Sequence, residues 1–508
     1  MNSIEKYNMT ISNYPEATFL SDGLLKFIKD INSLFEKRIA DALFARAILQ
    51  NELNHGLRLH ITEPPQEHWK VAPIPDDMKV RRVEITGPAS DTKMVINALN
   101  SGAHCYMADF EDSMSPTWEN VVQAHSNIIA AVDGIISLET NDKAYKLNKH
   151  TAKLMMRPRG LHLKEERVKV EDTPVNAMIF DLAIFTYLNA QKFIDRGETI
   201  ALYIPKLENA NEAKLVNDIL TSLEKALLLP ENCIRTTILC ETYPMIFELE
   251  SALWELKDRA LGINFGRYDF IFSMIKKIGN THMFPPKSKM TMESPFLMKC
   301  AERIVEVCQR HEAQPIGGMS ANLPVKGDHV EDVIARVQIR RDKMREAKQG
   351  FIGAWIAHPQ LKDIVNDIFE YADKKELEPA VDLHLLNAVP AGYPTYQELC
   401  DDIRTMMEYL YNWFKGKGAV SINNKMEDLA TAEINRMLLT NWRHHKMLCD
   451  GELLDDETLE IAIDQEHKNL LATGRFEDDH MLNWTASHFL FTFIKDQSTQ
   501  FMSELVWI

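Results

Sequence analysis

The sequence predicts an α/β protein built on a (β/α)₈ (TIM) barrel, with an N-terminal helical segment and a C-terminal all-α domain. Three observations support this fold. Short apolar runs alternate with longer segments of helical period between Arg82 and Pro359. The runs number eight, which is the strand count of such a barrel. On either side of this region the apolar residues recur only at helical spacing.

The first 75 or so residues predict helix, because apolar residues recur at intervals of three and four from Leu24 to Phe35. This segment ends in a proline-rich stretch from Pro64 to Pro75, which is typical of a domain boundary. We therefore assign residues 1–78 to an N-terminal helical clasp.

Residues 79–375 are assigned to the barrel. Its predicted strands are Val83–Thr86, Cys105–Ala108, Leu154–Met156, Ala201–Ile204, Thr237–Cys240, Gly262–Phe265, Pro315–Gly318 and Ala354–Ala357. An open doubly wound sheet is the alternative, but no Gly-x-Gly-x-x-Gly motif follows the first run. Residues 376–508 are assigned to a C-terminal helical cap, since the chain from Tyr396 onward is rich in Leu, Met and Trp at helical spacing.

Composition excludes several classes of protein. The formal net charge is −17, which disfavours nucleic-acid binding because phosphate contacts need a basic surface. The seven cysteines include no Cys-x-x-Cys pair, so neither a disulfide framework nor a zinc site is expected. There is no apolar run of membrane-spanning length, no signal peptide and no peroxisomal C-terminus. We expect a monomeric, cytoplasmic enzyme.

Two acidic residues follow neighbouring predicted strands. Glu241 comes directly after Cys240, and Asp269 follows Phe265 by a few residues. In such barrels the reactive groups lie just past the C-terminal ends of the strands. Two carboxylates there suit Mg²⁺, which takes oxygen ligands and keeps part of its water shell. The alternative is that each acid only caps the helix that follows it.

An arginine and a group of acids follow two other predicted strands. Arg157 precedes a Pro-Arg-Gly turn, and a guanidinium fixed there would suit an oxyanion or an enolate oxygen. A surface ion pair is the plainer interpretation. Asp109, Glu111 and Asp112 could be partners of metal-bound water, or they could form a solvated turn.

The segment from Lys425 to Glu433 lies in the C-terminal region and reads Lys-Met-Glu-Asp-Leu-Ala-Thr-Ala-Glu. Taken alone it predicts a helix start with acids in its first turn. Nothing in its spacing indicates chemistry.

Taken together and in order, these segments resemble the malate synthase family over nearly the whole chain from Arg82. The matching segments are Arg82–Pro88, Asn97–Ala103, Ala108–Ser113, Pro116–Asn120, Arg157–Gly160, Pro205–Glu208 and Glu427–Ile434. The length resembles the short isoform, which lacks an extra α/β domain inserted in the barrel. The resemblance implies a magnesium enzyme that condenses acetyl-CoA with glyoxylate to give malate and free CoA.

The resemblance also implies roles for single residues. Glu241 and Asp269 become the Mg²⁺ ligands, and Arg157 becomes the catalytic arginine that stabilises the enolate. Asp428 becomes the general base that removes a proton from the acetyl methyl group. The glyoxylate carboxylate is expected at the backbone that runs from Gly266 through Arg267 and Tyr268 to Asp269.

The chain departs from the family pattern without losing any of these groups. The departures are at Leu161, Arg259, Ile263, Tyr268, Phe270 and the segment Trp442–His445. Two other functions remain open. One is a malyl-CoA or citramalyl-CoA lyase, which uses a related barrel but does not explain a C-terminal domain carrying Asp428. The other is a catalytically weakened paralogue that binds metabolites, and retention of all four key side chains argues against it.

Overall fold

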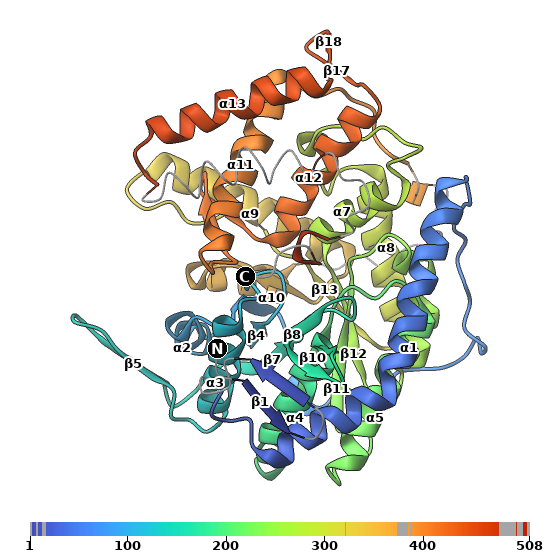
Figure 1. Ribbon diagram of the computed structural model, residues 1–508, viewed down its shortest axis with the longest axis vertical. Helices are drawn as coiled ribbons and strands as arrows, with labels where there is room; N and C mark the ends of the chain where they lie inside the picture. The colour runs from blue at the N-terminus through green and yellow to red at the C-terminus, as the bar shows by residue number, and fades with distance from the viewer. Residues whose placement is uncertain are drawn as a thin grey trace.

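The computed structural model describes residues 3–6, 9–12, 17–320, 322–372, 385–386, 388–476, 494 and 501–504. At its centre eight parallel strands close into a barrel, in the order β10-β11-β12-β13-β14-β3-β4-β7 (Figure 1). The strands are β3 (Val83–Pro88), β4 (Cys105–Asp109), β7 (Lys153–Arg157), β10 (Ile200–Ile204), β11 (Ile234–Cys240), β12 (Ala260–Phe265), β13 (Gln314–Gly317) and β14 (Gly353–Ile356). Each strand overlaps one of the eight apolar runs, so the predicted barrel is confirmed.

Helices surround the barrel and connect its strands (Figure 1). They are α2 (Thr92–Leu99), α3 (Trp118–Val132), α4 (Ala177–Asp195), α5 (Ala210–Ala226), α6 (Met245–Glu255), α7 (Arg267–Ile278), α8 (Pro295–Arg310), α9 (His329–Gln349) and α10 (Lys362–Tyr371). Several begin at a side chain that accepts a hydrogen bond from the first turn, among them Asp91, Thr117 and Asn176. These caps fix where α2, α3 and α4 begin.

The interior of the barrel is a packed core. Its buried residues are Met78, Cys105, Met107, Met155, Ala201, Tyr203, Leu239, Leu261, Ile316 and Trp355. At the N-terminal end of the barrel Arg81 donates to the fully buried Glu84 at 2.6 Å, and the Trp355 indole donates to Glu84 at 3.1 Å. Because side chains fill the barrel, the C-terminal ends of the strands are where a ligand can bind.

The N-terminal region contains the predicted helix and also two strands that were not predicted. Helix α1 (Asp22–Asn54) is present and runs along the outside of the barrel (Figure 1). Before it, β1 (Ser3–Lys6) and β2 (Met9–Ser12) form a four-stranded antiparallel sheet with β8 (Lys164–Val170) and β9 (Thr173–Asn176). Three of these strands, β1, β2 and β9, have only four residues, which is too little alternation to be recognised from the sequence. A further hairpin, β5 (Ser137–Glu139) and β6 (Ala144–Lys146), projects from the barrel.

The C-terminal region is mainly helical, as predicted, and lies against one end of the barrel (Figure 1). Its helices are α11 (Tyr396–Phe414), α12 (Leu429–His444) and α13 (Asp456–Ala472), with two small hairpins, β15 (Val420–Ile422) with β16 (Lys425–Glu427) and β17 (Leu448–Cys449) with β18 (Glu452–Leu453). Short 3₁₀ turns lie at Asp76–Met78, Lys287–Lys289, Pro359–Leu361 and Met502–Glu504. The predicted boundary at residues 375 and 376, and the last four residues, lie outside the described residues. None of the described helices has the length and apolar character needed to cross a membrane.

Candidate active site

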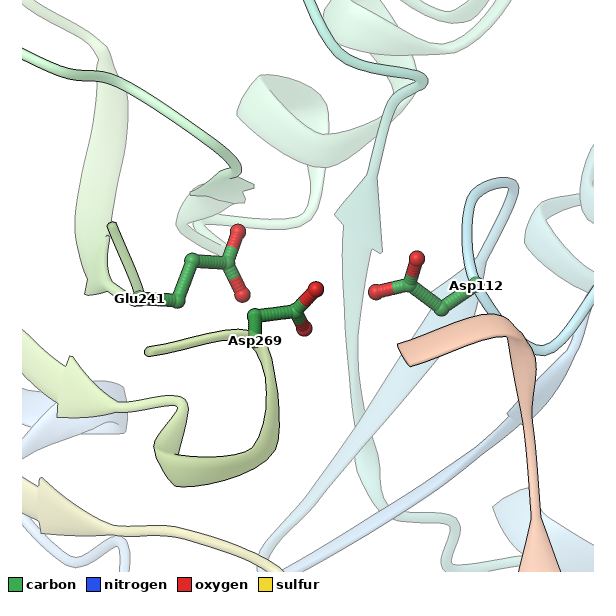
Figure 2. A group of neighbouring side chains, drawn as sticks. All are labelled: Asp112, Glu241 and Asp269. Atoms are coloured by element: carbon green, nitrogen blue, oxygen red, sulfur yellow. The ribbon is translucent and has the colours of Figure 1, made fainter. Parts of the chain in front are cut away.

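Three carboxylates converge at the C-terminal end of the barrel. Asp112 lies in the loop after β4, Glu241 follows β11, and Asp269 lies in the first turn of α7. Figure 2 shows their side chains pointing toward one another. One oxygen from each lies within 4.8 Å of the others, and all three residues are buried. The sequence predicted Glu241 and Asp269 as metal ligands and Asp112 as a partner of metal-bound water. The structure places all three in one cluster.

A buried lysine, for which the sequence predicted no role, lies in the same cluster. Lys206 Nζ is 2.8 Å from Asp269, 2.9 Å from Asp112 and 3.9 Å from Glu241. Its backbone N–H also donates to Glu241 at 2.7 Å. Lys206 comes two residues after β10, and this position at a strand end is the signal that could have found it.

Burial and mutual repulsion set the protonation of this cluster. Burial and the charge of Asp112 raise the pKa of Asp269 well above its usual value, and burial raises the pKa of Glu241. Burial acts in the same direction on Asp112, but Lys206 and Arg157 hold its pKa below the usual value. The cluster therefore has more carboxylates than nearby cations can neutralise, and an added cation would favour their charged forms.

The donor set fits a hard divalent cation. Its ligand atoms are carboxylate oxygens, as Mg²⁺ and similar ions prefer. Asp112 Oδ1 and the neighbouring Glu111 Oε1 are buried and have no hydrogen-bond partner among the described residues. Buried polar atoms without partners are rare, and a bound ion with its waters would satisfy both atoms. The cluster is thus chemically suited to hold a divalent metal.

Arg157 lies beside the cluster at the end of β7 and is held by Asp109. Its Nε and Nη2 donate to the two oxygens of Asp109 at 2.6 and 2.5 Å, while Nη1 lies 3.2 Å from Asp112. The Trp355 ring centre lies 5.7 Å from the guanidinium carbon. From the sequence, Asp109 was expected to be a partner of metal-bound water. In the structure it fixes the orientation of Arg157, because the two strand ends are neighbours in the barrel.

Asp428 comes from the C-terminal domain as the N-cap of α12. Its side chain accepts a hydrogen bond from the Thr431 N–H at 3.2 Å, and the Thr431 hydroxyl accepts from the Asp428 N–H at 3.0 Å. The next residue, Leu429, donates its N–H to the Asp112 carbonyl at 3.2 Å, which ties α12 to the barrel loop. Burial and the charge of Asp112 raise the pKa of Asp428 to about 7.

A cavity joins these groups beneath the C-terminal domain. It is lined by Thr86, Gly87, Pro88, Met94, Asp109, Asp112, Ser113, Arg157, Glu241, Gly266, Arg267, Tyr268, Asp269, Met319, Trp355, Ala357, Ala419, Met426, Asp428 and Ala430. All the predicted site residues line it except Glu111, which lines a smaller adjoining cavity with Asp112, Lys206 and Asp269. The apolar lining, chiefly Met94, Met319, Met426 and Trp355, was not predicted, since it comes from four separate segments.

Gly266 and the start of α7 form one wall of this cavity. A Cβ at Gly266 would lie 2.7 Å from Glu241 Cβ and 2.9 Å from Glu241 Oε2, so glycine allows the two strand ends to approach. The Arg267 guanidinium contacts the Tyr268 hydroxyl at 3.0 Å and the Asp342 carboxylate at 3.4 Å. Arg259, one of the departures from the family pattern, is fully buried and pairs with Glu224 of α5 at 2.9 Å, so it ties the strand preceding this site to α5.

Fold and cavity define a barrel enzyme that combines a carboxylate cluster for a divalent cation, a fixed arginine and a carboxylate delivered by a helical domain. Sequence comparison is more specific. Profiles described as "Malate synthase, TIM barrel domain" and "Malate synthase, C-terminal" match residues 153–380 and 393–506. The malate synthase of Myxococcus xanthus is 38% identical over 477 residues, covering 91% of this chain and 88% of that protein. The glyoxysomal malate synthase of Glycine max is 35% identical over 471 residues, covering 89% and 82%. The chain belongs to the malate synthase family.

Proposed function

We propose that this chain condenses acetyl-CoA with glyoxylate in the cavity at the barrel mouth, releasing malate and free CoA. The proposal rests on one observation: side chains suited to three different tasks line the same cavity. They are the carboxylates of Glu241 and Asp269, the guanidinium of Arg157 and the carboxylate of Asp428. A condensation of this type needs all three, because an acetyl thioester is a very weak carbon acid.

Asp428 is the proposed general base. Its carboxylate takes a proton from the acetyl methyl group, and the electron pair of that C–H bond moves into an enolate whose oxygen carries the charge. Arg157 stabilises this oxygen, and Asp109 keeps the guanidinium in a fixed orientation. A pKa of about 7 suits a base that must be ionised in neutral solution yet remain basic enough to accept a proton.

The enolate carbon then attacks the aldehyde carbon of glyoxylate, which forms the new C–C bond and leaves a hydroxyl group after protonation. The first-turn N–H groups of α7, from Arg267 to Asp269, are positioned to bind the glyoxylate carboxylate, as helix N-termini bind anions. Water finally cleaves the thioester, giving the second carboxylate of malate and the thiol of CoA.

Mg²⁺ is the proposed metal, and Glu241, Asp269 and Asp112 are the residues that would hold it. When bound, it supplies Lewis-acid polarisation of the carbonyl group that is attacked. The oxygen-only donor set and the excess of carboxylates over Lys206 support a hard divalent cation.

The proposal is tested by following thiol release from acetyl-CoA by the purified chain, with glyoxylate and with added Mg²⁺. We expect free CoA and malate to form in equal amounts, and both to stop in excess EDTA. A lyase would leave malyl-CoA intact and release no thiol. A metabolite-binding paralogue would bind glyoxylate without turnover. Either result would contradict the proposal.

A further inference from the structure

Helix α9 carries apolar side chains on its outer face. Val330, Val333, Ile334 and Val337 are 66%, 45%, 44% and 59% exposed. They recur at intervals of three and four residues, so they form a stripe along one face of the helix. We call these four residues the α9 stripe.

The inner face of α9 already has its partners. Ala335, Ile339 and Ala347 are buried, and the helix packs against α10 and α8 in the ring around the barrel (Figure 1). A helix on the outside of a barrel needs only one apolar face. Single exposed apolar side chains are common, but a continuous stripe marks a surface that another molecule covers. Helix propensity does not explain these apolar residues either, because valine and isoleucine are mediocre helix formers.

The charges on α9 change sign along its length. Asp328 and Glu331 lie exposed at its N-terminal end, and Arg340 and Arg341 lie exposed toward its C-terminal end. An identical helix that runs in the opposite direction would place acids near bases at both ends. A polyanion or an anionic membrane would instead meet repelling acids at one end. The face is therefore complementary to a copy of itself.

We propose that a second copy of this chain packs against the α9 stripe, with the two α9 helices antiparallel about a twofold axis. The register that fits sets Ile334 against the partner's Val337. Arg341 then lies beside the partner's Val330 and the partner's Glu331. Its aliphatic part covers the valine, and its guanidinium, which pairs with Glu293 at 2.5 Å within the chain, meets the partner's carboxylate as a second acid. A pair of 21-residue helices gives a small interface, so the dimer is expected to dissociate in the micromolar range.

This surface is separate from the chemistry. No residue of the α9 stripe lines either cavity at the barrel mouth. From the sequence we expected a monomer. Which apolar residues stay exposed is known only once the fold is known. Variants in the stripe should change association and leave turnover unchanged.

The test is sedimentation velocity of the full chain between about 1 and 100 μM, around the expected dissociation constant. We expect the mass to rise with concentration from the single-chain value of 58.3 kDa toward twice that value. The double variant Val333→Glu, Val337→Glu should remain a single chain throughout, with unchanged thiol release. Ile461→Glu is the matched control, because Ile461 is a 57% exposed isoleucine on α13 and does not belong to the α9 stripe. It should associate like wild type.

A charge exchange tests the antiparallel arrangement. Glu331→Arg and Arg341→Glu should each weaken association, and the two together should restore it, since each reversed residue again meets its opposite. If the wild-type chain stays monomeric at all concentrations, the proposal is overturned. The same result is expected if another part of the same chain covers the α9 stripe. Undiminished association of the double valine variant, or a combined charge variant weaker than both single ones, would overturn it as well.

Discussion

Replacing Arg157 by lysine tests whether a fixed guanidinium, and not merely a positive charge, supports turnover. The guanidinium spans both oxygens of Asp109 through two nitrogens and presents a third nitrogen near Asp112. A lysine keeps the charge but has one nitrogen, so it cannot span Asp109 and still point a donor into the cavity.

Two effects are expected, one on turnover and one on stability. Loss of one preorganised donor to a developing oxyanion costs about 100- to 1000-fold in turnover, or about 2.7 to 4 kcal/mol. Stability should change less, because lysine leaves Asp109 paired with a cation. Losing hydrogen bonds to a charged partner should lower the free energy of unfolding by about 1–3 kcal/mol.

The assay is thiol release at saturating acetyl-CoA and glyoxylate, with thermal unfolding measured on the same samples. Arg159→Lys is the matched control. Arg159 is also buried and donates through two nitrogens to Asp181, at 3.0 and 2.7 Å, but it does not line the larger cavity. It should lose similar stability and keep its turnover. If Arg157→Lys keeps more than half of the wild-type turnover, another group stabilises the enolate.

Three further predictions concern the metal and the base. Asp269→Ala should abolish divalent-cation binding in calorimetry, and with it turnover, while circular dichroism stays unchanged; retained binding would show that the ligands lie elsewhere. Gly266→Ala should weaken cation affinity by at least ~10-fold, because its Cβ would displace Glu241, and wild-type affinity would contradict this. The value of kcat/KM should fall as pH drops below about 7, because the raised pKa of Asp428 leaves its carboxylate protonated there. A bound metal ion would move this fall to lower pH. A flat pH profile of kcat/KM from pH 5 to 8 would be inconsistent with Asp428 as the base.

Much of the barrel could be predicted because its strands are buried on both faces and so read as continuous apolar runs. Glu241, Asp269 and Arg157 were found for the same reason, since each follows such a run. The sequence left their alternatives open, however. Whether a strand-end acid caps a helix or joins a cluster depends on the register of neighbouring strands. The spacing of residues along the chain does not reveal that register.

The contacts between distant segments were beyond the reach of the sequence. Lys206 enters the carboxylate cluster with a positive φ of 53°, a local conformation that its neighbours do not indicate. Asp109 was expected near metal-bound water, and this stays a prediction. Its contact with Arg157 was not expected, because it depends on β4 and β7 being adjacent across a long connection. Asp428 was found only by resemblance to a family. Its place in the cavity depends on α12 docking on the barrel, where Leu429 bonds to Asp112.

Asp428→Asn tests the central claim most directly. Asparagine is nearly isosteric and is as good an N-cap as aspartate, so the cap on Thr431 and the affinity for both substrates should be retained. The measurement is turnover, together with exchange of the acetyl methyl protons into deuterated solvent in the presence of an unreactive glyoxylate analogue. We predict that turnover falls by about 100- to 10,000-fold, the contribution of a positioned general base. Any exchange that the wild type shows should disappear. Turnover near the wild-type rate, or continued exchange, would place the base elsewhere, with the neighbouring Glu427 as the first candidate.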